Sequence, residues 1–213
     1  MTQRLKIAPT KSALLQLKKE VRFLQQGHDL LERKRELLTR LVYDRLAQYR
    51  EQRSKAREAL AEAYRWLAVT QMRMGGRALR RAALGMDPAL RVTILARSSI
   101  GVEYPSVRAE PLPIKPVGLM WTDPSFDETR AKLAEAAMLL ARLSESETAL
   151  WRLLKEQRKT QKRVNALKYN VIPRYRETLR FIEGALEEEE RNTLFQIKLL
   201  QQRASEDHPR SGR

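Results

Sequence analysis

The chain has 213 residues and carries 42 Lys and Arg against 26 Asp and Glu, a formal net charge of +16 at pH 7. Charged residues make up 32% of it, glycine is rare with 8 residues, and there is no cysteine. This balance suits long solvated helices better than a compact α/β enzyme core. The absence of thiols excludes disulfides, thiolate metal sites and cysteine nucleophiles.

The charge and the histidines narrow the possible ligands. A strongly basic chain prefers anionic partners, which are nucleic acid, acidic protein surfaces or membrane headgroups. The two histidines, His28 and His208, are far apart in sequence, so we expect neither a metal site nor a cofactor. No apolar run of about eighteen residues occurs, and the N-terminus lacks the apolar region of a signal peptide. We therefore expect an intracellular chain without a transmembrane helix.

The first helical pattern begins after Pro9-Thr10 and ends at a predicted break, Gly75-Gly76. Its apolar stripe has heptad-like spacing as far as Val42, where an extra four-residue step to Leu46 forms a stutter that locally unwinds a left-handed supercoil. The stripe also contains Leu14, Leu17, Val21, Leu24, Leu31, Leu38, Ala56, Leu60, Ala63 and Leu67. Roughly sixty helical residues would reach about 90 Å at a rise of 1.5 Å per residue.

The next segment changes character. A short helix is predicted over 77–84, and the β-branched run after Arg91 predicts a strand. A second strand follows Ser98-Ser99, and Pro105 is expected to end it, so a hairpin is the simplest account.

The end of the middle segment is rich in proline. Pro111, Pro113 and Pro116 predict an extended, non-helical stretch. Residues 118–121 are consistent with one more short strand. We interpret the whole segment as an elaborated connection between two helices, without a core of its own.

The second long helix is predicted to begin at Asp123-Pro124, with proline in the first helical position, and to run to about Gln202. Pro173 lacks an N–H group and clashes with the carbonyl of Tyr169, which predicts a kink or local opening. The glycine at 184 adds a second weak point. The expected stripe of this helix contains Leu133, Leu140, Leu143, Leu150, Leu154, Val164, Leu167, Val171, Tyr175, Leu179, Ile182, Leu186, Ile197 and Leu200.

The predicted fold class is mainly α. A long antiparallel two-helix coiled coil joins the N- and C-terminal segments, and a small middle insert holds a short helix and a β-hairpin. The alternative is a pair of helices within a larger bundle. We favour the hairpin of two helices, because the remaining chain is too short to cover both apolar stripes. The expected divisions are an N-terminal helix (1–74), the insert (75–123), a C-terminal helix (124–203) and a flexible tail (204–213).

Candidate functional residues are few. The chain has no phosphate-binding loop, dinucleotide fingerprint, zinc-protease motif or nucleophile elbow, so no catalytic residues are predicted. Arg158, Lys162 and Arg163 lie in a basic cluster of the second helix that is either a solvated face or a contact for acidic groups on a partner. A second cluster, Arg77 to Arg81, follows the glycine break.

Several further residues have ordinary structural interpretations. His28 is interpreted as a packed, hydrogen-bonded interhelical histidine. The three tryptophans, Trp66, Trp121 and Trp151, are interpreted as packing residues rather than stacking platforms for bases, because none lies in an aromatic-basic alternation.

Motifs at both ends of the chain resemble one family. The start reads Pro9-Thr10-Lys11, then Leu14, Leu17 and Lys18, then Gly27, Leu30-Leu31 and Lys34-Arg35. The second helix contains Lys162-Arg-Val-Asn-Ala-Leu-Lys-Tyr-Asn-Val-Ile-Pro-Arg, followed by Arg180-Phe-Ile and by Glu190-Arg-Asn-Thr-Leu-Phe-Gln-Ile-Lys. In this order the motifs resemble the D subunits of V-type and A-type ATPases. The departures are Glu36 in place of Asp, Lys162 where Arg is frequent, and Lys168 in place of Glu. The middle segment, about 73–123, does not match recognisably.

The resemblance implies a rotor. In that family the D protein is a non-catalytic central stalk whose terminal helices lie inside the hexamer of A and B subunits. The F subunit binds alongside, and the C subunit, called d in eukaryotes, links the stalk to the membrane ring. The implied place is the cytoplasmic face of a membrane, peripheral and without insertion. The implied role is to transmit torque between ATP hydrolysis or synthesis and ion transport. Our own hypotheses are that Arg158, Lys162 and Arg163 contact the hexamer and that the kink at Pro173 fits the coil to its bore.

Two other classes stay open. A structural or adaptor coiled coil with a basic surface would favour a uniform heptad without an elaborated middle, unlike this chain. A nucleic-acid binder would favour a concentrated basic patch or a recognised motif, whereas here the charge is spread along both helices.

Overall fold

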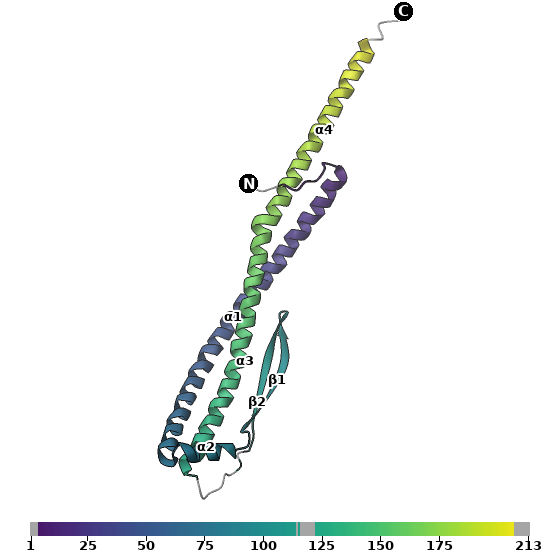
Figure 1. Cartoon of the computed structure of the whole chain (residues 1–213). Helices are drawn as coiled ribbons and strands as arrows, with labels where there is room; N and C mark the ends of the chain where they lie inside the picture. Colours follow the sequence, from purple (N-terminus) through teal and green to yellow (C-terminus); the bar gives the residue numbers. More distant parts are fainter. Residues whose placement is uncertain (1–3, 114, 116–121, 207–213) are drawn as a thin grey trace, which may run out of the picture. The chain divides into compact units, whose positions relative to one another are not determined.

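The structure is a computed structural model and describes residues 4–113, 115 and 122–206. The element order is α1 (Lys11–Met74), α2 (Gly76–Leu84), β1 (Leu90–Ser99), β2 (Val102–Pro111), α3 (Pro124–Ala166), the π-helical turn η1 (Leu167–Val171) and α4 (Ile172–Glu206) (Figure 1). The predicted mainly helical class, with a short helix and a hairpin in the insert, is confirmed. The proposed strand at 118–121, Trp121 and residues 207–213 of the tail lie outside the described residues.

The long helices begin where capping chemistry allows. Thr10 precedes α1, and its Oγ1 accepts the backbone N–H of Ala13 at 3.2 Å, as an N-cap side chain does. Asp123 has the same place before α3, with Pro124 in the first helical position. Gly75 separates α1 from α2 with φ 76° and ψ 154°, a conformation that only glycine adopts without strain.

The described residues form two compact units, one within residues 4–34 and 160–206 and the other within residues 35–159. In each unit α1 runs antiparallel to the helix that follows the insert. In the first unit, Lys11 pairs with Glu190 and Lys18 with Glu183, each at 2.7 Å. In the second, Glu62 pairs with Lys132 at 3.0 Å, and Ser146 hydrogen-bonds Gln52. In each unit, residues later in α1 contact residues earlier in the facing helix, as the antiparallel prediction requires.

The seam of the second unit is built from small side chains. Ala56, Ala63 and Thr70 follow one another at heptad spacing on α1 and are at most 2% exposed. Small residues let two helices approach closely, and each hydroxyl in such a seam can bond within its own helix. The buried residues of α3 in this unit are Ser125, Phe126, Thr129, Ala136, Ser146, Ala149, Leu150 and Leu153.

This seam corrects the predicted stripe of the second long helix. Leu133 and Leu140 are 38% and 39% exposed, whereas the small residues Thr129 and Ala136 are buried. The sequence offered two neighbouring stripes on one helix, and close packing selected the one with smaller side chains. At the other end, Ile197 and Leu200 are also exposed, because α4 extends beyond the start of α1 there (Figure 1).

The hairpin belongs to the core of the second unit. Val102 packs with Leu38 and Leu153, and Val42 lies against this cluster. The hairpin therefore shares the core of the helices.

The strands are longer than predicted. β2 continues through Pro105, which lies opposite Ala96, so the expectation that this proline ends the strand is wrong. In a hairpin with a two-residue turn, hydrogen-bonded and non-hydrogen-bonded pairs alternate from the turn outwards, and Pro105 falls at a non-hydrogen-bonded position. Its missing N–H would point away from β1, so the ladder loses no bond.

The outer edge of β2 is covered by α3. Glu145 accepts the outward N–H of Val107 at 3.0 Å, and Arg152 donates to the carbonyl of Glu103 at 2.8 Å. These two side chains satisfy groups that an edge strand otherwise leaves unpaired. Figure 1 shows the hairpin lying along α3.

Candidate functional site

The basic cluster predicted to bind a partner is exposed. Arg158, Lys162 and Arg163 all lie on α3 with solvent-exposed side chains. Within the described residues none of the three has an ion-pair or hydrogen-bond partner. Three uncompensated cations are free to bind carboxylates of another molecule, and a solvated face gives the same picture in an isolated chain.

A second group of free cations lies on α2. Arg77, Arg80 and Arg81 occupy one side of this nine-residue helix, which contains no acidic residue. The other side, with Ala78, Leu79 and Ala82, is half-buried. Ala78, Leu79 and Ala82 therefore point inward, whereas Leu84, at 89% exposure, and the arginines point outward. The arginines have no ion-pair partners in the part of the chain that the structure describes.

The C-terminal part of α4 exposes apolar side chains on all sides. All residues from 191 to 203 are exposed. The apolar ones are Leu194, Phe195, Ile197, Leu199 and Leu200, with exposed fractions from 40% to 64%. At about 100° per residue these side chains point in every direction around the helix axis. Polar and charged residues are interspersed among them, so the segment has no separate apolar face, and its exposed apolar side chains form a surface that a partner can cover.

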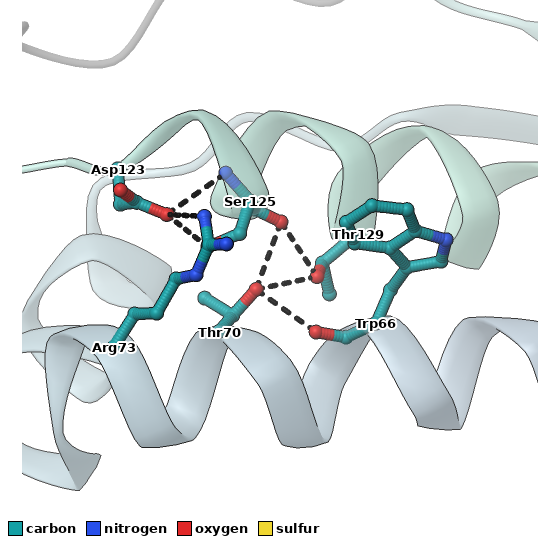
Figure 2. A network of polar contacts seen from close by, with 6 residues as sticks. All are labelled: Trp66, Thr70, Arg73, Asp123, Ser125 and Thr129. Atoms are coloured by element: carbon teal, nitrogen blue, oxygen red, sulfur yellow. Dashed lines mark hydrogen bonds and ion pairs between the residues drawn. The ribbon is translucent and has the colours of Figure 1, made fainter.

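A buried polar network joins the end of α1 to the start of α3 (Figure 2). The hydroxyl of Thr70 lies 2.8 Å from the Ser125 carbonyl oxygen and 2.8 Å from Thr129 Oγ1. Thr129 Oγ1 in turn donates to the Ser125 carbonyl at 2.9 Å. Thr70 is 0% and Thr129 2% exposed. The hydroxyls bond to one another and to the Ser125 carbonyl, which holds the two helices together where the insert departs.

Asp123 extends this network towards solvent. Its carboxylate accepts hydrogen bonds from the Ser125 hydroxyl and, at 3.1 Å, from the Ser125 backbone N–H. Arg73 lies 3.3 Å away. The Ser125 hydroxyl and N–H, followed by Arg73, hold the pKa of Asp123 below its ordinary value.

The N-terminal residues are tied to α4 within the first unit. The N–H of Leu5 donates to Thr178 Oγ1 at 3.1 Å. Arg4 lies 3.7 Å from Glu177 and 4.9 Å from the Phe181 ring centroid. The hydrogen bond from Lys11 lowers the pKa of Glu190.

Two structural interpretations from the sequence need correction. The hydrogen-bond partner of His28 is Asp29 of the same helix, at 3.2 Å, rather than a group on the facing helix. Trp151 is 66% exposed and does not pack in the core. It lies at the position after the buried Leu150, so one step around the helix decides between core and solvent.

The described residues contain no cluster of three His, Asp or Glu side chains that could hold a metal ion. Among the same residues, no helix has both the length and the apolar character that crossing a membrane requires.

Comparison with known proteins gives a consistent family. The model of the family described as the ATP synthase D subunit matches residues 13–202. The D subunit of the A-type ATP synthase from Pyrococcus furiosus is 35% identical over 205 residues, covering 93% of this chain and 94% of that protein. The D subunit of the V-type ATP synthase from Thermotoga neapolitana is 32% identical, covering 93% and 98%. The A-type counterpart from Methanosphaera stadtmanae is 32% identical, covering 94% and 95%. The chain therefore belongs to the family of ATP synthase D subunits.

Proposed function

We propose that this chain is the central-stalk shaft of a rotary ATPase of the V/A type and that it carries torque without catalysing a reaction. Two antiparallel helices supply length and stiffness. Family membership supports the assignment to the complex. The observation that carries the shaft role is the end of α4, which extends beyond α1 as a single helix and exposes apolar side chains in several directions around its axis.

The exposed apolar side chains at the end of α4 are best covered by a partner that surrounds the helix. One flat partner would cover only one side of residues 191–203 and leave the opposite apolar side chains in water. A ring of subunits around the helix covers all of them. We propose that this ring is the hexamer of A and B subunits, which would also carry the ATP chemistry.

The other partners follow from the same assignment. The F subunit would bind alongside the shaft, and the C subunit, or d, would connect it to the membrane ring. The chain would then be peripheral to the membrane, on its cytoplasmic face. Neither direct membrane insertion nor specific nucleic-acid binding is part of the proposal.

Arg158, Lys162 and Arg163 are proposed to contact acidic loops of the hexamer. Exposed charge pairs of this kind form and break readily, because water screens them and their individual energies are small. Such contacts suit a shaft that must leave each orientation as it turns.

Stoichiometry tests the proposal directly. Tagged chain is co-expressed with A, B and F subunits and examined by native mass spectrometry. We expect one copy of this chain for three A and three B. A homodimer that binds none of the three would instead favour the alternative, a structural or adaptor coiled coil.

The basic cluster is tested by changing Arg158, Lys162 and Arg163 together to Gln. We expect weaker assembly or torque, with a smaller dependence on salt because fewer charges take part. The matched control removes three exposed arginines of the hairpin, Arg91, Arg97 and Arg108, and should keep assembly with A and B. Unchanged assembly and turnover in the first variant would refute the assigned contacts.

Pro173 is proposed to bend the second long helix to fit the bore. Changing Pro173 to Ala restores an N–H group and should stiffen the helix, reducing coupling between hydrolysis and rotation while the isolated chain stays folded. Full coupling in this variant would exclude a role for the bend.

A further inference from the structure

The turn η1 is wider than the helices that it joins. Ile172 donates its N–H to the Leu167 carbonyl, five residues back, instead of the four of an α-helix. The residues on either side, Ala166 and Ile172, have ordinary α-helical dihedrals. The turn is therefore one π-helical insertion in an otherwise regular helix, a feature that is rare and concentrated at functional sites.

The spacing of buried residues accounts for the insertion. Thr160 and Val164 are each 2% exposed. On the far side of the turn the seam continues with Ile182, at 0%, and the half-buried Leu186, while the buried Thr178 accepts the N–H of Leu5 from the N-terminal segment. The second pair follows the first by twenty-two residues, which is three heptads and one surplus residue.

The surplus residue has a geometric consequence. A continuous α-helix would rotate the second pair by about 100° from the seam, because each residue turns the helix by that amount. A π-helical turn holds one more residue than an α-helical turn and so absorbs the difference. The same count holds locally, since Val164 and the buried Ile172 are eight residues apart rather than seven.

Pro173 acts on the same turn in a second way. It has no N–H to offer the Tyr169 carbonyl, and its ring would press on that carbonyl in an α-helix. The side chains of Lys168, Tyr169 and Asn170 are exposed, so water can reach this side of the turn. The backbone there can exchange hydrogen-bond partners without burying an unpaired group.

We propose that η1 is a torsionally compliant joint in the second long helix, kept wide by the surplus residue in the seam and only assisted by Pro173. When α4 is twisted, backbone N–H groups in η1 can change their hydrogen-bond acceptor between the carbonyl four residues back and the carbonyl five residues back. This exchange takes up the twist. The use of this joint to take up torque rests on the proposed shaft function. The joint itself is a property of the chain alone.

Hydrogen exchange on the isolated full chain tests the joint. In the unmodified chain we expect the amides of residues 167–172 to exchange about tenfold faster than those of 176–182, which lie in regular helix. Changing Pro173 to Ala should leave most of this difference, because the surplus residue remains. Deleting Asn170 together with Pro173→Ala removes both causes and should abolish the difference. The length-preserving Asn170→Ala is the matched control and should keep it.

Two results would overturn the inference. One is equal protection of both segments in the unmodified chain, which decides the matter even if the deletion variant does not fold. The other is loss of the difference in Pro173→Ala alone, which would make proline the whole cause.

The assembled complex separates this inference from the proposed function. Angular fluctuations of a probe on the shaft should narrow in the deletion variant if the joint is the compliant element. Unchanged fluctuations in a complex that assembles with A and B would reject the joint and leave the shaft role intact. Failure of the unmodified chain to join A and B would reject the shaft role, while hydrogen exchange still decides the joint.

Discussion

The hydroxyl network between α1 and α3 gives a quantitative prediction at Thr70. This residue is 0% exposed, and its Oγ1 lies 3.0 Å from the Trp66 carbonyl and 2.8 Å from the Ser125 carbonyl. Changing Thr70 to Val keeps the shape and removes the hydroxyl. Thr129 still donates to the Ser125 carbonyl, so no buried donor is left unpaired. The loss is then about one net hydrogen bond, about 0.5–1.5 kcal/mol in the free energy of unfolding.

Urea unfolding followed by far-ultraviolet circular dichroism measures this loss. In a thermal scan, each 1 kcal/mol should lower Tm by about 2–4 °C for a chain of this length. Changing Thr193 to Val is the matched control, because Thr193 has the same bond to the carbonyl four residues back but is exposed on α4. Its effect should stay within about 0.5 kcal/mol, as for surface substitutions generally.

A double-mutant cycle with Thr129→Val tests whether the network acts as a unit. Both hydroxyls share the Ser125 carbonyl, and an apolar replacement of both partners is less costly than two separate losses. The double variant should therefore cost less than the sum of the single variants, with a coupling energy of about 0.5 kcal/mol or more. Strict additivity, or an unchanged midpoint in Thr70→Val, would refute this account of the network.

Further predictions concern single positions. Because the folded pKa of Asp123 is depressed, its contribution to stability is present above the ordinary value of 3.8 and should be lost as pH falls through the lower folded value. Urea midpoints between about pH 5 and pH 2 should therefore show less acid sensitivity in Asp123→Asn, and identical profiles would contradict the cause assigned here. Ile100 has φ 51° in the hairpin turn, so Ile100→Asn should stabilise the chain by about 1 kcal/mol, measured by thermal unfolding. Ile100→Val keeps a β-branched residue at positive φ and should gain nothing; an equal gain would rule out backbone strain. Gly184 lies within α4, and a Cβ there would meet no atom within 4 Å, so Gly184→Ala should raise stability by about 0.5–1 kcal/mol. A lower unfolding midpoint for this alanine variant would show that the glycine has a role beyond helix propensity.

Sequence alone determined the elements and their order. Thr10, Gly75 and Asp123-Pro124 set the helix boundaries, because capping and glycine conformation are local properties that a few neighbouring residues decide. The apolar periodicity predicted two long antiparallel helices around a hairpin insert, and the structure has them. Motifs at both ends pointed to the family to which the chain belongs. The basic cluster of Arg158, Lys162 and Arg163 was visible as charge, although its role stays a prediction.

The tertiary structure decided what depends on more than one segment. Thr129 and Ala136 are buried in the seam, whereas Leu133 and Leu140 are exposed. The close approach of the two helices, and not hydrophobicity, selects between these adjacent stripes. β2 continued through Pro105 because the pairing register placed its missing N–H on the outer side.

The π-helical turn shows the same limit. Proline predicted a disturbance at that place, but only the structure showed that one π-helical turn, Leu167–Val171, takes up the surplus residue in the seam. Local propensity fixes where a helix can form. Which of its faces is buried, and where its register must shift, depends on the partner packed against it.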